Sequence, residues 1–290
     1  MTLNITPSEQ NCGAFVTGLS LNSPLSEDVI ASLRAAWLDN LVLVFPDQRL
    51  SPADILHFAQ NFGAFGPEPF VTPHSDHPGI VPVERRADET GPLFAGTWHT
   101  DWSFLKHPPI GTCLYSLQIP PTGGDTLFAN QYAALSAIPD KLRQEITGKR
   151  AIHSARNAYA PDGTYRQLNG VDSAMQIDTD DCAHAETSHP IIHTHAETGQ
   201  PALYGTRGHI VRLEGLSEEN SKPILGELFR WQTRPEFQFR LKWAPNMLVM
   251  WDNRALIHMA TGGYQGHARK LLRTMIGPNT TASPNVATGF

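Results

Sequence analysis

The chain has 290 residues, of which 40% are hydrophobic and 17% are charged, and its formal net charge is −6. This composition is typical of a globular protein with a sizeable core and excludes a largely disordered chain. The acidic balance argues against a nucleic-acid partner, and no apolar run approaches the roughly 18 residues that a membrane-spanning helix needs. The N-terminal segment lacks the basic start and apolar centre of a secretory signal, so we expect a cytoplasmic protein.

The first expected elements in chain order are a helix, a strand and a second helix. Ser26 can cap a helix that runs to about Asn40 and carries apolar side chains at helical spacing. Residues 41–45 (LVLVF) form a continuous apolar run that is typical of a buried strand. Ser51–Pro52 begins the second helix and Gly63 ends it. Residues 66–98 then have the composition of a long loop, which can be a binding loop or a surface excursion.

Strands dominate the second half of the chain. Two strands around a turn, which form a hairpin signal, are expected over residues 110–130, and another hairpin is expected over 189–206. The other expected elements are a helix over 218–230 and strands over 237–243, 246–251 and 269–276. We expect little regular structure in the tail from Pro278.

This order favours one particular fold class. A mainly β protein with flanking helices buries its apolar faces in a β-sandwich or jelly-roll core rather than in a doubly wound α/β sheet. We expect residues 1–290 to form a single domain. The three cysteines are widely spaced and form no CxxC pair, so neither a disulfide framework nor a zinc ribbon is expected.

The pattern His-x-Asp suggests a metal site. Non-haem iron(II) oxygenases use two imidazoles and one carboxylate on one face of the metal, and residues i and i+2 of a strand point to the same side. The pattern is common by chance and occurs twice, at His74–Asp76 and at His99–Asp101. The second copy lies between aromatic residues in TWHTDWSF, which suits a dry site, whereas the first lies in a loop rich in Pro and His. We therefore favour His99 and Asp101.

A third ligand must come from another part of the chain. His258, which follows the apolar run LVMW and a polar turn, is the candidate, although a lone histidine of this kind is more often structural. The Glu variants of the pattern at His184 and His195 rank lower, and we interpret His193 and His195 as ordinary strand residues.

The segment after His258 contains a candidate site for a dicarboxylate. In a strand, GHARKLLRTMIG would place Arg269 and Arg273 on one face, and an inward face would require anionic partners for both. In the reverse alternation, Lys270 and Thr274 would face inward and both arginines would lie at the surface. Thr126, after the turn GGD, can donate a hydrogen bond to the same carboxylate.

Taken together, these segments resemble the taurine dioxygenase (TauD/TfdA) family of Fe(II)- and 2-oxoglutarate-dependent dioxygenases. The matching segments are WHTDWSF, PPTGGDTLFAN, PEFQFRLKW and WDNRALIHMATGGYQGHARKLLR, and the resemblance covers almost the whole chain. It implies a double-stranded β-helix (jelly roll) in which His99, Asp101 and His258 bind Fe(II) and O2 is a cosubstrate. It also implies that Arg269 and Thr126 bind the distal carboxylate of 2-oxoglutarate.

The same resemblance suggests a class of substrate. Arg273 corresponds to the arginine that holds the substrate sulfonate, and His74 falls near another substrate contact. Ala95 stands where the taurine enzyme uses a polar residue, and Arg85 and Arg86 have no clear counterpart, so we expect a substrate other than taurine. A small anionic molecule with an apolar body (a sulfonate, sulfate ester or carboxylate) would suit Arg273 beside Trp102, Phe104 and Tyr204. The resemblance also implies a homo-oligomer, either a dimer or a tetramer.

Three alternatives remain open from the sequence. A cupin-type jelly-roll metalloprotein would need the triad but would not need Arg269 and Thr126. A non-enzymatic binding module would need none of these residues. A dioxygenase that acts on a protein side chain is the third alternative, and the acidic net charge makes us favour a small molecule.

Overall fold

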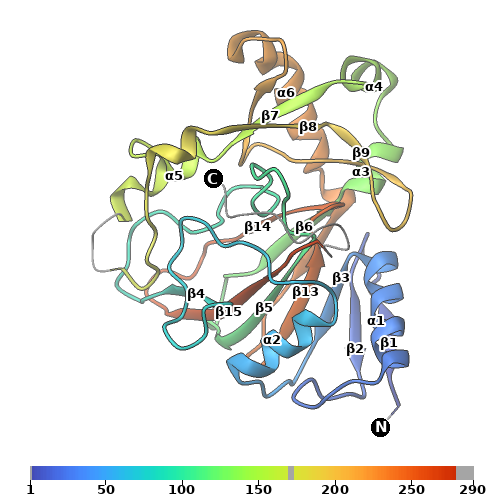
Figure 1. Cartoon of the computed structure of the whole chain (residues 1–290), viewed down its shortest axis with the longest axis vertical. Helices are drawn as coiled ribbons and strands as arrows, with labels where there is room; N and C mark the ends of the chain where they lie inside the picture. The colour runs from blue at the N-terminus through green and yellow to red at the C-terminus, as the bar shows by residue number, and fades with distance from the viewer. Residues whose placement is uncertain (1, 169–172, 279–290) are drawn as a thin grey trace, which may run out of the picture.

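A seven-stranded sheet lies at the centre of the computed structural model, which describes residues 2–168 and 173–278 (Figure 1). Its strand order is β1-β2-β3-β13-β5-β15-β4, and only the β2–β3 pair is parallel. The strands are β1 (Asn4–Pro7), β2 (Ala14–Thr17), β3 (Val42–Phe45), β4 (Val81–Arg85), β5 (Gly111–Gln118), β13 (Leu248–Asp252) and β15 (Arg269–Ile276).

Two helices cover one face of this sheet. They are α1 (Glu27–Asn40), capped by the Ser26 side chain, and α2 (Pro52–Gln60), which begins with a capping box at Ser51. Because successive side chains of a strand point to opposite faces, Leu43 and Phe45 of β3 pack with the helices, while Val42 and Val44 pack on the other side. A strand that is apolar throughout is therefore buried on both faces.

A three-stranded sheet with the order β12-β6-β14 covers the opposite face. Its strands are β6 (Thr126–Asn130), β12 (Gln238–Leu241) and β14 (Leu256–Ala260). Phe128, Phe239 and Leu256 belong to the same apolar cluster as Val44 and Leu271 of the large sheet, so the two sheets form a sandwich. This arrangement confirms the expected jelly-roll core.

The remaining elements lie beside this sandwich, and Figure 1 shows α4, α6, β7 and β8 together at one end of the molecule. One small sheet has the order β11-β7-β8, and β9 pairs with β10. The strands are β7 (Arg150–Ser154), β8 (Glu186–Pro190), β9 (Ile192–Thr194), β10 (Pro201–Leu203) and β11 (Ile210–Leu213). The helices are α3 (Gln131–Ser136), α4 (Asp140–Ile146), α5 (Arg156–Tyr159) and α6 (Glu218–Gln232), with 3₁₀ turns at Thr164–Leu168, Asp181–His184 and Pro235–Phe237.

Most of the expected elements are confirmed, and two expectations are wrong. The strands expected over 110–130 form, but β5 and β6 belong to different sheets, because β13 and β15 already pair with both edges of β5. The expected loop 66–98 contains the edge strand β4, where Pro82 is tolerated but weakens the strand pattern. Almost all of the expected unstructured tail from residue 278 lies outside the described residues.

Candidate active site

Three predicted metal ligands meet between the two sheets. The ligand atoms of His99, Asp101 and His258 all lie within 4.8 Å of one another, and this is the one cluster of its kind among residues 2–168 and 173–278. Oδ1 of Asp101 is 3.5 Å from Nε2 of His99 and 3.7 Å from Nε2 of His258. Two imidazoles and one carboxylate around one point form a facial set that leaves the other side of a metal open.

A short backbone bridge brings the two histidines together. The N–H of His99 donates to the carbonyl of His258 at 3.0 Å, and the N–H of His258 donates to the carbonyl of His99 at 2.8 Å. As a result their rings lie side by side, with centroids 4.2 Å apart. The expectation of an extended strand over 99–101 is only partly met, because His99 forms an isolated bridge and Asp101 lies in the turn that follows.

Neighbouring groups orient the ligand atoms. Nδ1 of His99 is 2.8 Å from the carbonyl of Thr97, so a proton on Nδ1 leaves Nε2 available for a metal. The Thr112 hydroxyl donates to Oδ2 of Asp101 at 2.7 Å, and Asn253 in turn donates to that hydroxyl at 2.9 Å. The His258 ring packs against Phe128 and Trp251.

The protonation states also suit metal binding. Burial and the neighbouring His99 lower the pKa of His258 to about 3, so its imidazole is neutral near pH 7. Burial alone would raise the pKa of Asp101, but His258, His99 and Arg273 together hold that pKa well below its usual value. A neutral imidazole and an ionised carboxylate are the forms that bind a metal.

Arg269 and Thr126 line a small cavity next to the triad, together with Asp101 and His258. Arg269 is 6% exposed, and its Nε and Nη2 have no hydrogen-bond partner among the described residues. The Thr126 hydroxyl accepts from the Trp243 indole at 3.0 Å, which leaves its own proton free to donate. Two unpartnered guanidinium nitrogens beside a free hydroxyl suit a carboxylate.

Of the two alternations considered for β15, the structure has the one in which Arg269 and Arg273 face inward. Arg269 and Arg273 are both buried, whereas the Lys270 side chain is 45% exposed and forms an ion pair with Glu84 at 2.7 Å. Burial lowers the pKa of Arg269 to about 10, which still leaves the guanidinium charged near neutral pH. A buried cation of this kind requires an anion.

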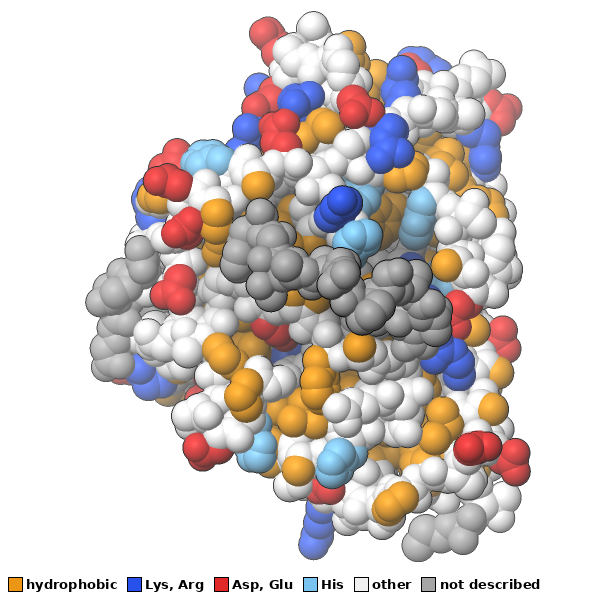
Figure 2. Space-filling view, in the orientation of Figure 1, with side chains coloured by type: hydrophobic (Ala, Val, Ile, Leu, Met, Phe, Trp, Pro, Cys, Tyr) orange, Lys and Arg blue, Asp and Glu red, His pale blue; other side chains and the backbone are white. Residues whose placement is uncertain are grey.

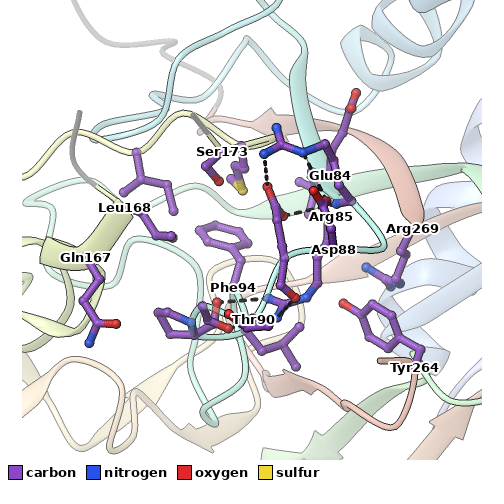
Figure 3. Close-up of a pocket in the computed structure, with 18 residues that line it drawn as sticks. Glu84, Arg85, Asp88, Thr90, Phe94, Gln167, Leu168, Ser173, Tyr264 and Arg269 are labelled. Carbon is purple, nitrogen blue, oxygen red and sulfur yellow. Dashed lines mark hydrogen bonds and ion pairs between the residues drawn. The ribbon is translucent and has the colours of Figure 1, made fainter. Parts of the chain in front are cut away.

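Arg269 also reaches a second cavity, of about 320 Å³, which residues 83–94 line in part. Figure 3 shows Arg269 and Tyr264 at one edge of this cavity and Arg85 and Asp88 near its centre. The Arg85 guanidinium donates to the carbonyls of Glu89 at 2.8 Å and Gly91 at 2.9 Å. Arg85 therefore holds its own loop together, a role that the sequence did not reveal.

The largest cavity at the triad has a volume of about 380 Å³ and opens on the other side of His99 and Asp101. Its apolar wall includes Phe94, Trp102 and Tyr159, and its polar groups include His209. Trp102 has a backbone φ of 47°, a left-handed conformation that is strained for a bulky residue and is typical of functional sites. This cavity is large enough for a small organic molecule.

Arg273 lines this cavity but already has a partner within the chain. Its Nε and Nη2 donate to the two oxygens of Glu68 at 3.1 and 2.6 Å, and the Trp102 indole donates to Glu68 at 3.1 Å. Glu68 was not among the residues predicted from the sequence. It lies in a proline-rich loop and is separated from Arg273 by 205 positions, so no local pattern marks it.

The other predicted substrate contacts lie in different places. Phe104 packs against Trp102 and the His209 ring behind the cavity wall. Tyr204 packs among His153, His189 and His193, away from the cavity lining. His74 forms a short bridge with His77 and does not line the cavities at the triad, so the structure does not bring these two residues to the metal ligands.

The jelly roll, the cluster of two histidines and one aspartate, and the adjacent buried arginine suit an Fe(II)- and 2-oxoglutarate-dependent dioxygenase. Comparison with known proteins agrees. The family model described as "Taurine catabolism dioxygenase TauD, TfdA family" matches residues 4–275. The chain therefore belongs to the TauD/TfdA family and is a dioxygenase with Fe(II), 2-oxoglutarate and O2 as its metal and cosubstrates.

Individual relatives support this placement. The chain is 30% identical to a (S)-phenoxypropionate/alpha-ketoglutarate-dioxygenase of Sphingobium herbicidovorans over 268 residues, which cover 89% of both proteins. It is 32% identical to an alkylsulfatase of Acinetobacter baylyi over 274 residues, with 93% of this chain and 84% of the relative covered. A crystal structure of a taurine dioxygenase from Burkholderia xenovorans is similar, with a TM-score of 0.79, 27% identity and 97% and 91% of the two chains covered.

Proposed function

We propose that this dioxygenase hydroxylates a small anionic organic substrate (a sulfonate, sulfate ester or carboxylate with an apolar body) and releases succinate and CO2. The observation that carries the proposal is that His99, Asp101 and His258 line the same cavity as Arg269. Two nitrogens of Arg269 have no hydrogen-bond partner among the residues that the structure describes. The cavity of about 380 Å³ beside the triad suits such a substrate, and its aromatic wall suits an apolar body. One relative is named for phenoxypropionate, and another is named for sulfate esters.

The residues have separate roles in this proposal. His99, Asp101 and His258 hold Fe(II), which together with 2-oxoglutarate and O2 supplies the oxidising chemistry. Arg269 and Thr126 bind the distal carboxylate of 2-oxoglutarate and so fix its orientation. Trp102 and Tyr159 exclude water and position the carbon of the substrate that is hydroxylated.

The test is an anaerobic titration of the metal-free protein with Fe(II) and then 2-oxoglutarate, with the weak visible charge-transfer band of the chelate as readout. We expect the band for the wild type and for His74→Ala, and we expect none for His99→Ala. His74 is a matched control, because it belongs to the other His-x-Asp pattern and lies outside the cavities at the triad. Folded protein that binds iron without giving a band would contradict the roles of Arg269 and Thr126.

We also propose that residues 1–290 form a single domain and that the protein is a cytoplasmic homo-oligomer, either a dimer or a tetramer. No helix among the described residues is long and apolar enough to cross a membrane. Cys12, Cys113 and Cys182 are free thiols, as is usual in a reducing compartment. On the face in Figure 2, acidic and basic side chains are interspersed, which agrees with a small-molecule substrate rather than nucleic acid. Light scattering of the purified protein measures the oligomeric state.

A further inference from the structure

The cation at the base of the substrate cavity is neutralised by the protein itself. Three N–H groups, two from Arg273 and one from Trp102, donate to the two oxygens of Glu68, which is the arrangement around an ionised carboxylate. The Arg273 and Glu68 side chains are only 5% and 10% exposed, so water screens this ion pair weakly. A substrate anion placed at Arg273 would also lie close to the carboxylate of Glu68, which would repel it.

The charges on the metal side of the cavity also balance. Bound Fe(II), ionised Asp101, the Arg269 guanidinium and a doubly charged 2-oxoglutarate together carry no net charge. Arg269 and Arg273 therefore offer no uncompensated positive charge to an anionic substrate, which needs another cation in this cavity.

Arg207 is such a cation. It lies in the loop between β10 and β11, is exposed to solvent, and lines the cavity beside the buried His209. Among the described residues it has no ion-pair partner, in contrast to Arg273. An exposed arginine at the edge of a cavity can bind a carboxylate or sulfate with two nitrogens while the apolar part of the substrate lies deeper.

We propose that Arg207, rather than Arg273, binds the anionic group of the substrate, because Glu68 occupies Arg273. This inference rests on the proposed function and concerns the recognition of the substrate. It reverses the orientation that the family resemblance implies: the charged end of the substrate lies at the cavity edge, and the apolar end lies toward Arg273 and the aromatic rings of Phe94 and Trp102.

The experiment measures binding to the anaerobic complex of protein, Fe(II) and 2-oxoglutarate, through the change in its charge-transfer band or by calorimetry. The probes are 2-phenoxypropionate, hexyl sulfate and the neutral 2-phenoxypropionamide. The variants are Arg207→Gln and the matched control Arg230→Gln, an exposed arginine that lines a neighbouring cavity together with Arg207 but does not line the substrate cavity.

We expect Arg207→Gln to weaken the binding of an anionic probe by roughly 10- to 100-fold, because it removes charge-assisted hydrogen bonds. The neutral amide should bind Arg207→Gln as it binds the wild type, and Arg230→Gln should resemble the wild type with every probe. In the double variant Glu68→Gln/Arg207→Gln, the released Arg273 should recover part of the lost anion binding, which a purely structural role of Glu68 would not produce.

Three results would overturn the proposal. They are an unchanged affinity of Arg207→Gln for the anions, failure of every anion to bind the wild-type complex, and no recovery in the double variant. If the proposed function itself is wrong, the result differs from all three, because the charge-transfer band is then absent before any probe is added.

Discussion

Removal of the Arg269 guanidinium should have opposite effects on the free protein and on the protein with cosubstrate. In the free protein, Nε and Nη2 of Arg269 are buried and have no hydrogen-bond partner in the described part of the chain. Arg269→Met therefore removes an uncompensated charge and should leave stability unchanged or raise it. With Fe(II) and 2-oxoglutarate, the same change removes the partner of a buried carboxylate. That loss should cost about 2–5 kcal/mol, or roughly 30- to 5,000-fold in the dissociation constant of 2-oxoglutarate.

Thermal unfolding under anaerobic conditions can measure both effects. At a 2-oxoglutarate concentration 100 times the wild-type dissociation constant, the wild type should gain about 2.7 kcal/mol of stability, and Arg269→Met should gain about 0.9 kcal/mol or less. Lys270→Met is the control, because Lys270 is the next residue of β15 and its half-exposed side chain pairs with Glu84 outside the cavity. A 2-oxoglutarate affinity of Arg269→Met within threefold of the wild-type value would refute the assignment of Arg269.

Three further predictions concern the metal site and the core. Thr112→Val removes the donor to Asp101 and should weaken Fe(II) binding about 10- to 100-fold in a metal titration, while similar affinities would leave Thr112 without a role. Asp252 is buried with Arg254 and His195, so Asp252→Asn should lower the free energy of unfolding at pH 7 by about 3–5 kcal/mol. Burial opposes ionisation of Asp252, but His195 and Arg254 hold its pKa below the usual value. The stabilisation by ionised Asp252 is therefore complete above the unfolded pKa of about 3.9 and decreases as the pH falls toward the lowered pKa. In urea unfolding, the difference in free energy of unfolding between the wild type and Asp252→Asn should be smaller at pH 3 than at pH 7. Finally, a chelator should abolish succinate release and added Fe(II), but not Mg(II), should restore it, because an imidazole-rich site disfavours Mg(II).

The residues of the candidate metal site could be predicted because their chemistry is visible in local patterns. His99 and Asp101 lie two positions apart among aromatic residues, and His258 lies shortly before the two arginines of β15. The local structure was predicted less well, since the pair forms a bridge and a turn rather than a strand. A bridge of one residue pair depends on the packing of the whole sandwich, which hydrophobic periodicity does not report.

The substrate side of the site could not be predicted in the same way, because it is assembled from loops. Glu68 and Arg207 lie in separate loops, with no regular spacing to the triad. His74 was chosen from such a loop, and the structure places it beside His77 rather than at a cavity of the triad. Loop residues obtain their positions from tertiary contacts, so a single sequence contains little information about them.

The two arginines of β15 illustrate how the structure separates residues that look equivalent in the sequence. Both were expected to need an anion from outside the chain if they faced inward, and both are buried. The chain supplies Glu68 to Arg273, but it leaves two nitrogens of Arg269 without a partner among the described residues. Because an unpaired buried cation is costly, Arg269 indicates a bound anion, whereas Arg273 is already neutralised by the fold. The proposed site for the substrate anion is therefore Arg207, which lines the same cavity as Arg273 and has no ion-pair partner among the described residues.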